Sequence, residues 1–157
     1  MPAQTAALRE LRSQLAQRGV VLPRGTLPFM FGNTPALASH LAALVAKGQK
    51  TATAGLLWAW EAEAGGPPHV GQVYAVHDSD GTPITVIENI TVQIVPFNCV
   101  TEAFAREEGE GDLSLDWWRR THWHYFSDEC RRLGREPVED MPIVCQRFRI
   151  LYPAQAS

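Results

Sequence analysis

One long amphipathic helix pattern lies between two runs of strand-forming residues, and it limits the folds that this chain can adopt. Over about residues 113–133, the residues of its core face recur at helical spacing: Leu115, Trp118, His122, Tyr125, Phe126 and Leu133. A stripe of this length has to be buried against neighbouring elements. Because strands are predicted before and after it, the helix is expected to cover a sheet.

The rest of the chain supplies the remaining elements of such a fold. Further helices are expected over 4–18, 35–47 and 101–107, with Thr34 and Thr101 as N-caps and Pro35 at a first helical position. Strands are expected over 53–62, 70–77, 83–95 and 142–152, and an ordered loop over 19–34. This order predicts an α+β fold around a mostly antiparallel, barrel-like sheet.

Length and composition indicate one folded domain. The 157 residues fall within the range of roughly 100–200 that is typical of a domain, and 45% of them are hydrophobic and 20% charged. A disordered chain would be poorer in apolar residues. The uncharged apolar runs are far shorter than the roughly 20 residues that span a bilayer, and the first residues lack the apolar core of a signal peptide. We therefore expect a cytoplasmic protein that does not bind membranes.

The net charge and the cysteine positions limit the ligands that this chain is expected to bind. Lys and Arg number 14 against 17 Asp and Glu, which gives a net charge of −3. Proteins that bind long nucleic acid are usually much more basic, so an RNA loop or a nucleoside would have to bind through a local patch. Cys99, Cys130 and Cys145 show neither a CxxC motif nor zinc spacing, and they are expected to be buried free thiols.

The first candidate for chemistry is the segment Gly48-Gln-Lys50-Thr-Ala-Thr53, at a predicted junction of helix and strand. A Lys whose pKa is lowered by burial can activate a Thr hydroxyl as a nucleophile. In a flat strand the two side chains point to opposite faces, so a bent entry would be needed to bring them to one opening. The alternative is that Lys50 only interacts with the negative end of the preceding helix.

The second candidate is the acidic stretch 102–116, which contains six acids and one Arg. Its Gly-Glu-Gly segment does not resemble a phosphate-binding loop, because the surrounding carboxylates would repel the ligand. The stretch is either a carboxylate held at a helix end as a general acid or base, or a solvated acidic turn.

The third candidate is the sequence WWRRTHWH over residues 117–124. His122 and His124 lie about 200° apart around a helix, so they cannot bind one metal ion together. Trp118 and His122 belong to the core face. Trp and Arg can stack nucleic-acid bases, and aromatic residues beside a core stripe can equally serve packing. Both interpretations stay open for the residues outside the core face: Trp117, Arg120, Trp123 and His124.

Together these motifs resemble the ASCH domain family, a branch of the PUA-like superfamily, in its longer bacterial form. The resemblance runs from about residue 30 to 152. It depends on Gly48-x-Lys50-x-x-Thr53, on the EEGEGDLS sequence over 107–114, and on Trp118-Arg119-x-x-His122. It implies a PUA-like β-barrel with flanking helices over 30–153, preceded by an N-terminal helix and loop over 1–29 that pack on it.

The resemblance also implies a cleft that acts on RNA or modified nucleosides. Small members of the family deacetylate the exocyclic amine of acetylated cytidine, without metal or cofactor. Their motif makes Thr53 the nucleophile, Lys50 the proton acceptor and Glu108 the proton donor. These roles require Lys50 to be neutral for part of the time and Glu108 to hold a proton.

The same resemblance implies residues that bind the substrate beside this cleft: Asp112, Arg119 and Trp117. Asp112 and Arg119 are expected to flank the cleft, either as an ion pair that positions Glu108 or as a purely structural pair. Two other functions remain open, namely a ribonuclease that uses the same cleft and a non-catalytic RNA-binding module.

Overall fold

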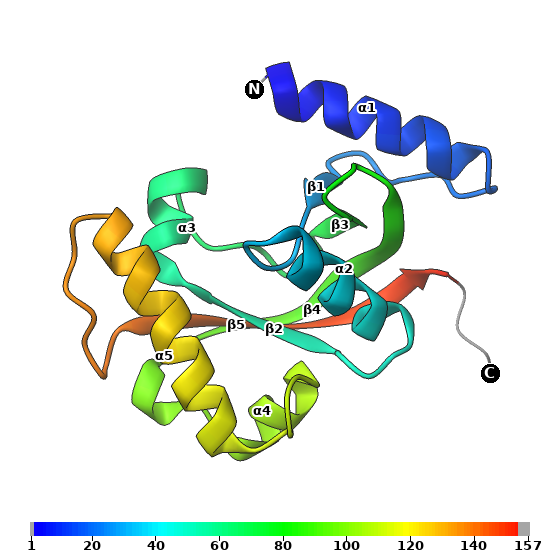
Figure 1. Cartoon of the computed structure of the whole chain (residues 1–157). Coiled ribbons are helices and arrows are strands. Elements are labelled where there is room, and N and C mark those ends of the chain that lie inside the picture. Colours follow the sequence, from blue (N-terminus) through cyan, green and yellow to red (C-terminus); the bar gives the residue numbers. More distant parts are fainter. Residues whose placement is uncertain (1, 154–157) are drawn as a thin grey trace. The chain divides into compact units, whose positions relative to one another are not determined.

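The computed structural model describes residues 2–153, so residue 1 of the predicted N-terminal segment lies outside the described part (Figure 1). The helices and strands follow one another in this order: α1 (Pro2–Ala16), β1 (Leu27–Phe29), α2 (Pro35–Ala46), β2 (Ala52–Leu56), α3 (Leu57–Ala64), β3 (Val73–His77), β4 (Pro83–Pro96), the 3-10 helix η1 (Phe97–Cys99), α4 (Glu102–Glu108), α5 (Leu115–Arg132) and β5 (Pro142–Tyr152).

The five strands form one mixed sheet in the order β1-β3-β4-β5-β2. β3 pairs antiparallel with β4, and β2 pairs antiparallel with β5, whereas β1 runs parallel to β3. The predicted α+β class with a mostly antiparallel sheet is therefore confirmed. Within residues 2–153, no helix combines the length and the apolar character needed to cross a membrane.

Two elements differ from the sequence prediction. The expected strand over 53–62 ends at Leu56, where α3 begins, because residues 57–64 (LWAWEAEA) are mostly good helix formers. Gly65 then ends α3 in the left-handed conformation. The expected loop over 19–34 contains β1, whose pairing with β3 joins segments far apart in the sequence and has no local signal.

The chain divides into two compact units, which are described one at a time. The first comprises the residues up to Gln49, Gly71–Asn89, and the chain from Phe148 onward. In it, α1 buries Leu11 and Leu15 against a small cluster that includes Val73, Ala75 and Val86. Thr34 caps α2 as predicted, since its hydroxyl accepts a hydrogen bond from the backbone N–H of Leu37.

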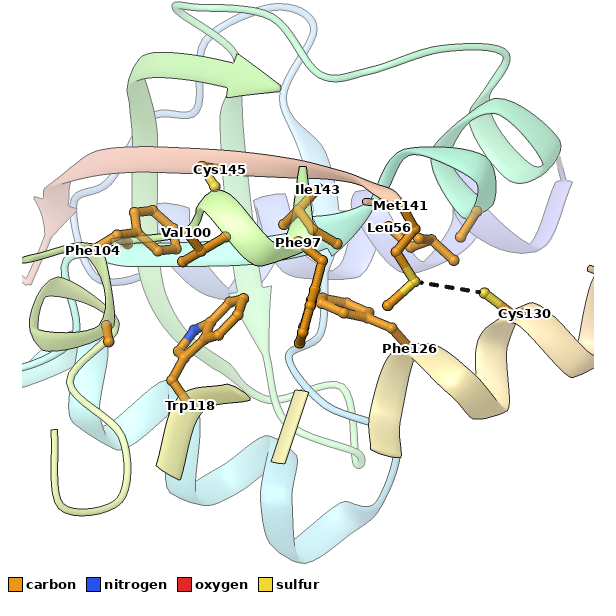
Figure 2. Close-up of a cluster of buried hydrophobic side chains, with 13 residues drawn as sticks. Leu56, Phe97, Val100, Phe104, Trp118, Phe126, Cys130, Met141, Ile143 and Cys145 are labelled. Carbon is orange, nitrogen blue, oxygen red and sulfur yellow. Dashed lines mark hydrogen bonds between the residues drawn. The ribbon is translucent and has the colours of Figure 1, made fainter. Parts of the chain in front are cut away.

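The second unit comprises Lys50–Val70 and Ile90–Arg147, and its core lies where α5 packs on β2 and β5. Figure 2 shows Phe97, Trp118 and Phe126 pointing toward one another. The ring of Phe97 lies 5.5 Å from that of Trp118 and 6.3 Å from that of Phe126. These contacts confirm the core stripe of the long helix, because Trp118 and His122 are buried whereas Trp117 is half-buried and His124 exposed.

The cysteines are free thiols, as expected, but only two of them are buried. Cys130 and Cys145 belong to the core of the second unit, and Figure 2 shows Cys130 beside Met141. Cys99 is exposed at the end of η1, so the prediction of burial is wrong there. The buried residue of η1 is Phe97, and Val100, which directly follows Cys99, is buried as well.

Replacing Trp118 by alanine is expected to lower the free energy of unfolding by roughly 3–5 kcal/mol, because the indole is 1% exposed and its removal leaves a cavity. The change also removes a buried N–H donor. Urea denaturation of wild type, Trp118→Ala and Trp117→Ala measures the effect. Because Trp117 is only half-buried, Trp117→Ala should lower the free energy of unfolding by less than Trp118→Ala does. Equal losses for the two variants would contradict this assignment of the core face.

Candidate active site

A fully buried lysine lies at the centre of the second unit's polar residues. Lys50 lies two residues before the start of β2, and its side chain is 0% exposed. Its Nζ donates hydrogen bonds to Glu108 Oε2 at 2.7 Å, to Glu110 Oε2 at 2.6 Å and to the carbonyl oxygen of Ala52 at 2.8 Å. The ammonium group is thus held between two carboxylates that come from the end of α4 and the turn after it.

Glu108, the last residue of α4, has partners for both carboxylate oxygens. Oε2 accepts from Lys50, and Oε1 accepts from the indole Nε1 of Trp118 at 2.9 Å. The Nε2 atom of His122 lies 3.4 Å from the same Oε1. Two residues one helical turn apart on α5 therefore contact one carboxylate oxygen, and Lys50 contacts the other.

The contacts of His122 favour its doubly protonated form. Its Nδ1 lies 2.9 Å from the carbonyl oxygen of Trp118, which can only accept, so this nitrogen carries a hydrogen. Nε2 faces a carboxylate and donates to it only when the ring is an imidazolium. Burial is the largest single influence and would lower the pKa of His122, but the charge and hydrogen bond of Glu108, the charge of Glu110 and the contact with the Trp118 backbone together raise that pKa. The ring also stacks on Trp118 at 4.2 Å.

Glu110 is placed by the tight turn between α4 and α5. Gly109 and Gly111 both have positive φ, and a Cβ atom at Gly111 would lie 2.2 Å from the ring of Trp117. Only glycine fits there, both for its backbone and for its contact with Trp117. The turn directs Glu110 toward Lys50 and leaves its side chain 13% exposed. Glu110 is therefore more accessible to solvent than Lys50, which is 0% exposed, and Glu108, which is 1% exposed.

The charges in this group shift one another's pKa values in different directions. Burial alone would lower the pKa of Lys50, but Glu108 and Glu110 outweigh it and raise that pKa. Burial would raise the pKa of Glu108, but Lys50 and His122 hold it well below its usual range. Burial and the charge of Glu108 raise the pKa of Glu110, whereas Lys50 lowers it. The net result is a pKa of about 7.

These directions correct the protonation states expected from the sequence. Lys50 is charged rather than partly neutral, and Glu108 is ionised rather than protonated. The physical reason is their direct contact at 2.7 Å, which stabilises both charges. Among the residues around Lys50, the carboxyl group that exchanges a proton near neutral pH is that of Glu110, and no sequence pattern distinguishes it from the other acids of the segment 102–116.

The predicted nucleophile is not among these hydrogen bonds. Thr53 lies in β2 opposite Gln146 of β5 and is half-buried. Within residues 2–153 its hydroxyl makes no hydrogen bond to the protein. Its strand neighbours Ala52 and Ala54 pack on the core that contains Trp118, so alternation directs the Thr53 side chain to the other face. The structure thus joins Lys50 to Glu108 and leaves Thr53 apart.

The residues expected to bind substrate are dispersed around the start of α5. Asp112 accepts hydrogen bonds from the backbone N–H of Ser114 at 2.9 Å and from its hydroxyl at 2.6 Å. Arg119 donates to the carbonyl oxygen of Asn98 at 3.5 Å. Asp112 and Arg119 do not form the expected ion pair, since the Asp112 carboxylate is used in the turn that begins the helix. Trp117 is half-buried beside that turn.

Three members of the group have the chemistry to hold a metal ion. Ligand atoms of Glu108, Glu110 and His122 lie within 4.8 Å of one another. The Lys50 ammonium, however, already contacts one oxygen of each carboxylate, and a cation there would have to displace it. The positive charge beside the two carboxylates is therefore that of the Lys50 ammonium group.

Glu110 predicts a pH dependence of stability. Its pKa rises from an ordinary 4.5 to about 7 on folding, so its contribution is complete below pH 4.5 and is lost as the pH rises through 7. The shift corresponds to at most about 3 kcal/mol. His122, whose pKa is also raised, acts in the same direction. Urea denaturation between about pH 5 and 8 should show falling stability. Glu110→Gln should make the profile less steep, with a remaining slope from Glu129, whose pKa burial also raises to about 7, and an unchanged slope in that variant would contradict the assignment.

Comparisons with known proteins agree with this architecture. A family model described as "ASCH domain" matches residues 28–152. Two solved structures are similar over most of both chains. One is an ASCH domain from Lactobacillus crispatus JV V101, with 33% identity, 93% of this chain and 92% of that chain covered, and a TM-score of 0.77. The other is protein EF3133 from Enterococcus faecalis V583, with 28% identity, coverages of 94% and 89%, and a TM-score of 0.80. No curated protein matches the chain.

Proposed function

The chain belongs to the ASCH domain family, and from this premise we propose that it is a hydrolase that removes the acyl group from the exocyclic amine of a cytidine-type nucleoside. The supporting observation is the Lys50 Nζ, completely buried at 2.7 and 2.6 Å from the carboxylates of Glu108 and Glu110. Such buried ion groups add little to stability compared with apolar packing, whereas perturbed pKa values gather at functional sites.

In this proposal Glu110 carries the proton. With a pKa of about 7 it is ionised in a large share of molecules at neutral pH, so it can accept a proton and return it. Lys50 stays charged, orients Glu110 and offsets negative charge that develops on the acyl oxygen. Glu108 stays ionised and positions Lys50 and His122, in place of the donor role that the resemblance implied.

The nucleophile is the Thr53 hydroxyl, which has no protein partner within the described residues. β2 is an edge strand of the sheet. A substrate that lies along this edge can contact side chains that project from either face of β2. The Thr53 oxygen attacks the acyl carbon while a water molecule at the edge of β2 carries its proton to Glu110, because Thr53 does not contact Glu110 directly. The carbon–nitrogen bond then breaks and Glu110 returns the proton to the leaving amine. Water hydrolyses the resulting threonine ester, releasing the acid and restoring the hydroxyl.

The test is to incubate the full chain with cytidine acetylated on its exocyclic amine and, separately, with a structured RNA. The proposal expects cytidine and acetate in equal amounts, with the RNA left intact. Cleavage of the RNA without deacetylation would indicate a ribonuclease. Absence of both reactions, together with RNA binding, would indicate the non-catalytic module. Either of these results would overturn the proposed activity.

A further inference from the structure

The second half of β4 leaves one side of the strand without a neighbour. β3 pairs with β4 only as far as Glu88, and the last backbone hydrogen bonds on this side join Asn89 to the segment 71–72. Over residues 90–96, β4 continues with no strand beside it there, and within the described range 2–153 no helix or loop bonds to its backbone on that side. We call residues 90–96 the open β4 edge.

The backbone groups of every second residue face the open β4 edge. Asn89 directs both its N–H and its C=O to this side, since both form hydrogen bonds of 2.9 Å with the segment 71–72. The direction of these groups alternates from residue to residue along a strand, so those of Thr91, Gln93 and Val95 point to the open edge. Unpaired N–H and C=O groups in such a row are a template for pairing with another strand.

The side chains on one face of the open β4 edge are apolar and exposed. Ile90 and Ile94 are 50% and 48% exposed, and Val92 lies between them on the same face. Gln93 points to the opposite face, where it accepts a hydrogen bond from Arg147 at 3.1 Å. The edge therefore offers unpaired backbone groups beside an exposed apolar stripe, which is the combination used when one strand binds another.

The absence of charge distinguishes the open β4 edge from ordinary edge strands. Proteins usually protect an exposed edge with a charged side chain, above all lysine, or with a proline inside the strand. Residues 90–95 contain neither, and no Asp, Glu, Lys or Arg occurs from Asn89 to Val100. When two identical strands pair antiparallel, the residues near the midpoint lie close to their own copies, so a charge there would be repelled by its copy. This edge carries no such repulsion.

We propose that two copies of this chain associate through the open β4 edge, as an antiparallel pair of strands related by a two-fold axis at Gln93. In this register Gln93 pairs with the partner's Gln93, and Thr91 pairs with the partner's Val95. All three residues that face the open edge then exchange both backbone hydrogen bonds with the second copy. An axis at Val92 would instead place the partner's Val95 opposite Asn89, whose backbone groups are already bonded, so fewer hydrogen bonds would form.

The side chains agree with the same register. Val92 lies opposite the partner's Ile94, and Ile90 lies opposite the partner's Pro96, so the two apolar stripes continue one another across the interface. A strand from another protein could also satisfy the backbone groups, but the match of this uncharged stripe with itself favours a second copy. The interface uses neither the Lys50 group nor the edge of β2, and it does not depend on the proposed hydrolysis.

The first experiment measures the mass of the full chain by sedimentation equilibrium from about 10 μM to about 1 mM, because an interface of one short strand belongs to the small, weak class. The mass should rise from that of the 17.4 kDa monomer toward twice that value. Ile94→Lys should raise the dissociation constant at least about 10-fold, because the two-fold axis introduces the charge into both halves of the interface.

Val138 supplies a matched control, because it is 41% exposed and belongs to the same unit but lies outside β4. Val138→Lys should leave the dissociation constant unchanged. Circular dichroism of both lysine variants should match wild type, since both positions are exposed. Equal effects of the two variants would overturn the proposal. A chain that stays monomeric at every concentration would also overturn it, and would leave the edge to a strand of another protein.

A cross-linking experiment tests the register. Cys99 is exposed and is replaced by serine in the starting variant, whereas Cys130 and Cys145 are buried. Gln93→Cys places two thiols on the axis, where the Cα atoms of a hydrogen-bonded pair lie about 5.5 Å apart, within the range of a disulfide. Ile90→Cys is also exposed, but its two copies lie about 20 Å apart in this register. Mild oxidation should link Gln93→Cys into dimers and leave Ile90→Cys monomeric. Equal cross-linking of the two variants, or none in Gln93→Cys, would contradict the proposed pairing.

Discussion

Replacing Lys50 by methionine is expected to lower the free energy of unfolding by about 3–5 kcal/mol at pH 7. Methionine keeps much of the side-chain volume but removes the charge between Glu108 and Glu110. Glu108 is 1% exposed and would stay buried without its main counter-charge. Glu110 is closer to solvent and its pKa is already about 7, so it would take up a proton at smaller cost. Most of the loss therefore comes from Glu108.

Two further variants separate the effect of charge from other effects of the substitution. The chain has only one other lysine, Lys47, which is exposed at the end of α2. Lys47→Met should change stability by no more than about 0.5 kcal/mol. The double variant Lys50→Met with Glu108→Gln should be more stable than Lys50→Met alone, because both charges are removed together. Urea denaturation measures all three, and a Lys50→Met variant as stable as wild type would contradict the described ion group.

Glu110→Gln is expected to reduce the deacetylation rate by about 10²- to 10⁴-fold, because the amide cannot carry the proton between Thr53 and the leaving amine. In wild type the rate should change with an apparent pKa near 7. This is the pKa of Glu110, which burial and Glu108 raise although Lys50 lowers it. The remaining rate of the variant should lack that inflection. Thr53→Ala should be at least as impaired, since it removes the nucleophile while leaving ligand binding nearly intact.

The neighbouring acid supplies a control for the loss of a carboxylate. Glu107 precedes Glu108 in α4, but its side chain forms an ion pair with Arg147 instead of contacting Lys50. Glu107→Gln should keep the wild-type rate and pH profile. Initial rates of cytidine release over about pH 5–9 compare the variants. If Glu110→Gln retained both the rate and the inflection, another group would have to be the proton carrier.

Local sequence patterns were sufficient for most elements of the fold. The stripe containing Trp118 and His122 predicted the long helix and its buried face, and Thr34 and Thr101 marked two helix starts correctly. These features depend on periodicity and on hydrogen bonds within a few residues, which a sequence displays directly. The missed strand β1 depends on pairing with β3 across more than forty residues of intervening chain, for which Leu27–Phe29 carries no local signal.

The candidate site was determined only in part by the sequence. Its motifs pointed to Lys50 and Glu108, but they could not show that both are buried in mutual contact at 2.7 Å. Protonation states followed from that contact, because a pKa depends on burial and on charges brought together from distant segments. The same holds for Glu110 and His122, which joined the group through the turn after α4 and one face of α5. Sequence supplied the chemical groups, and tertiary packing decided which of them hold a charge and which can exchange a proton.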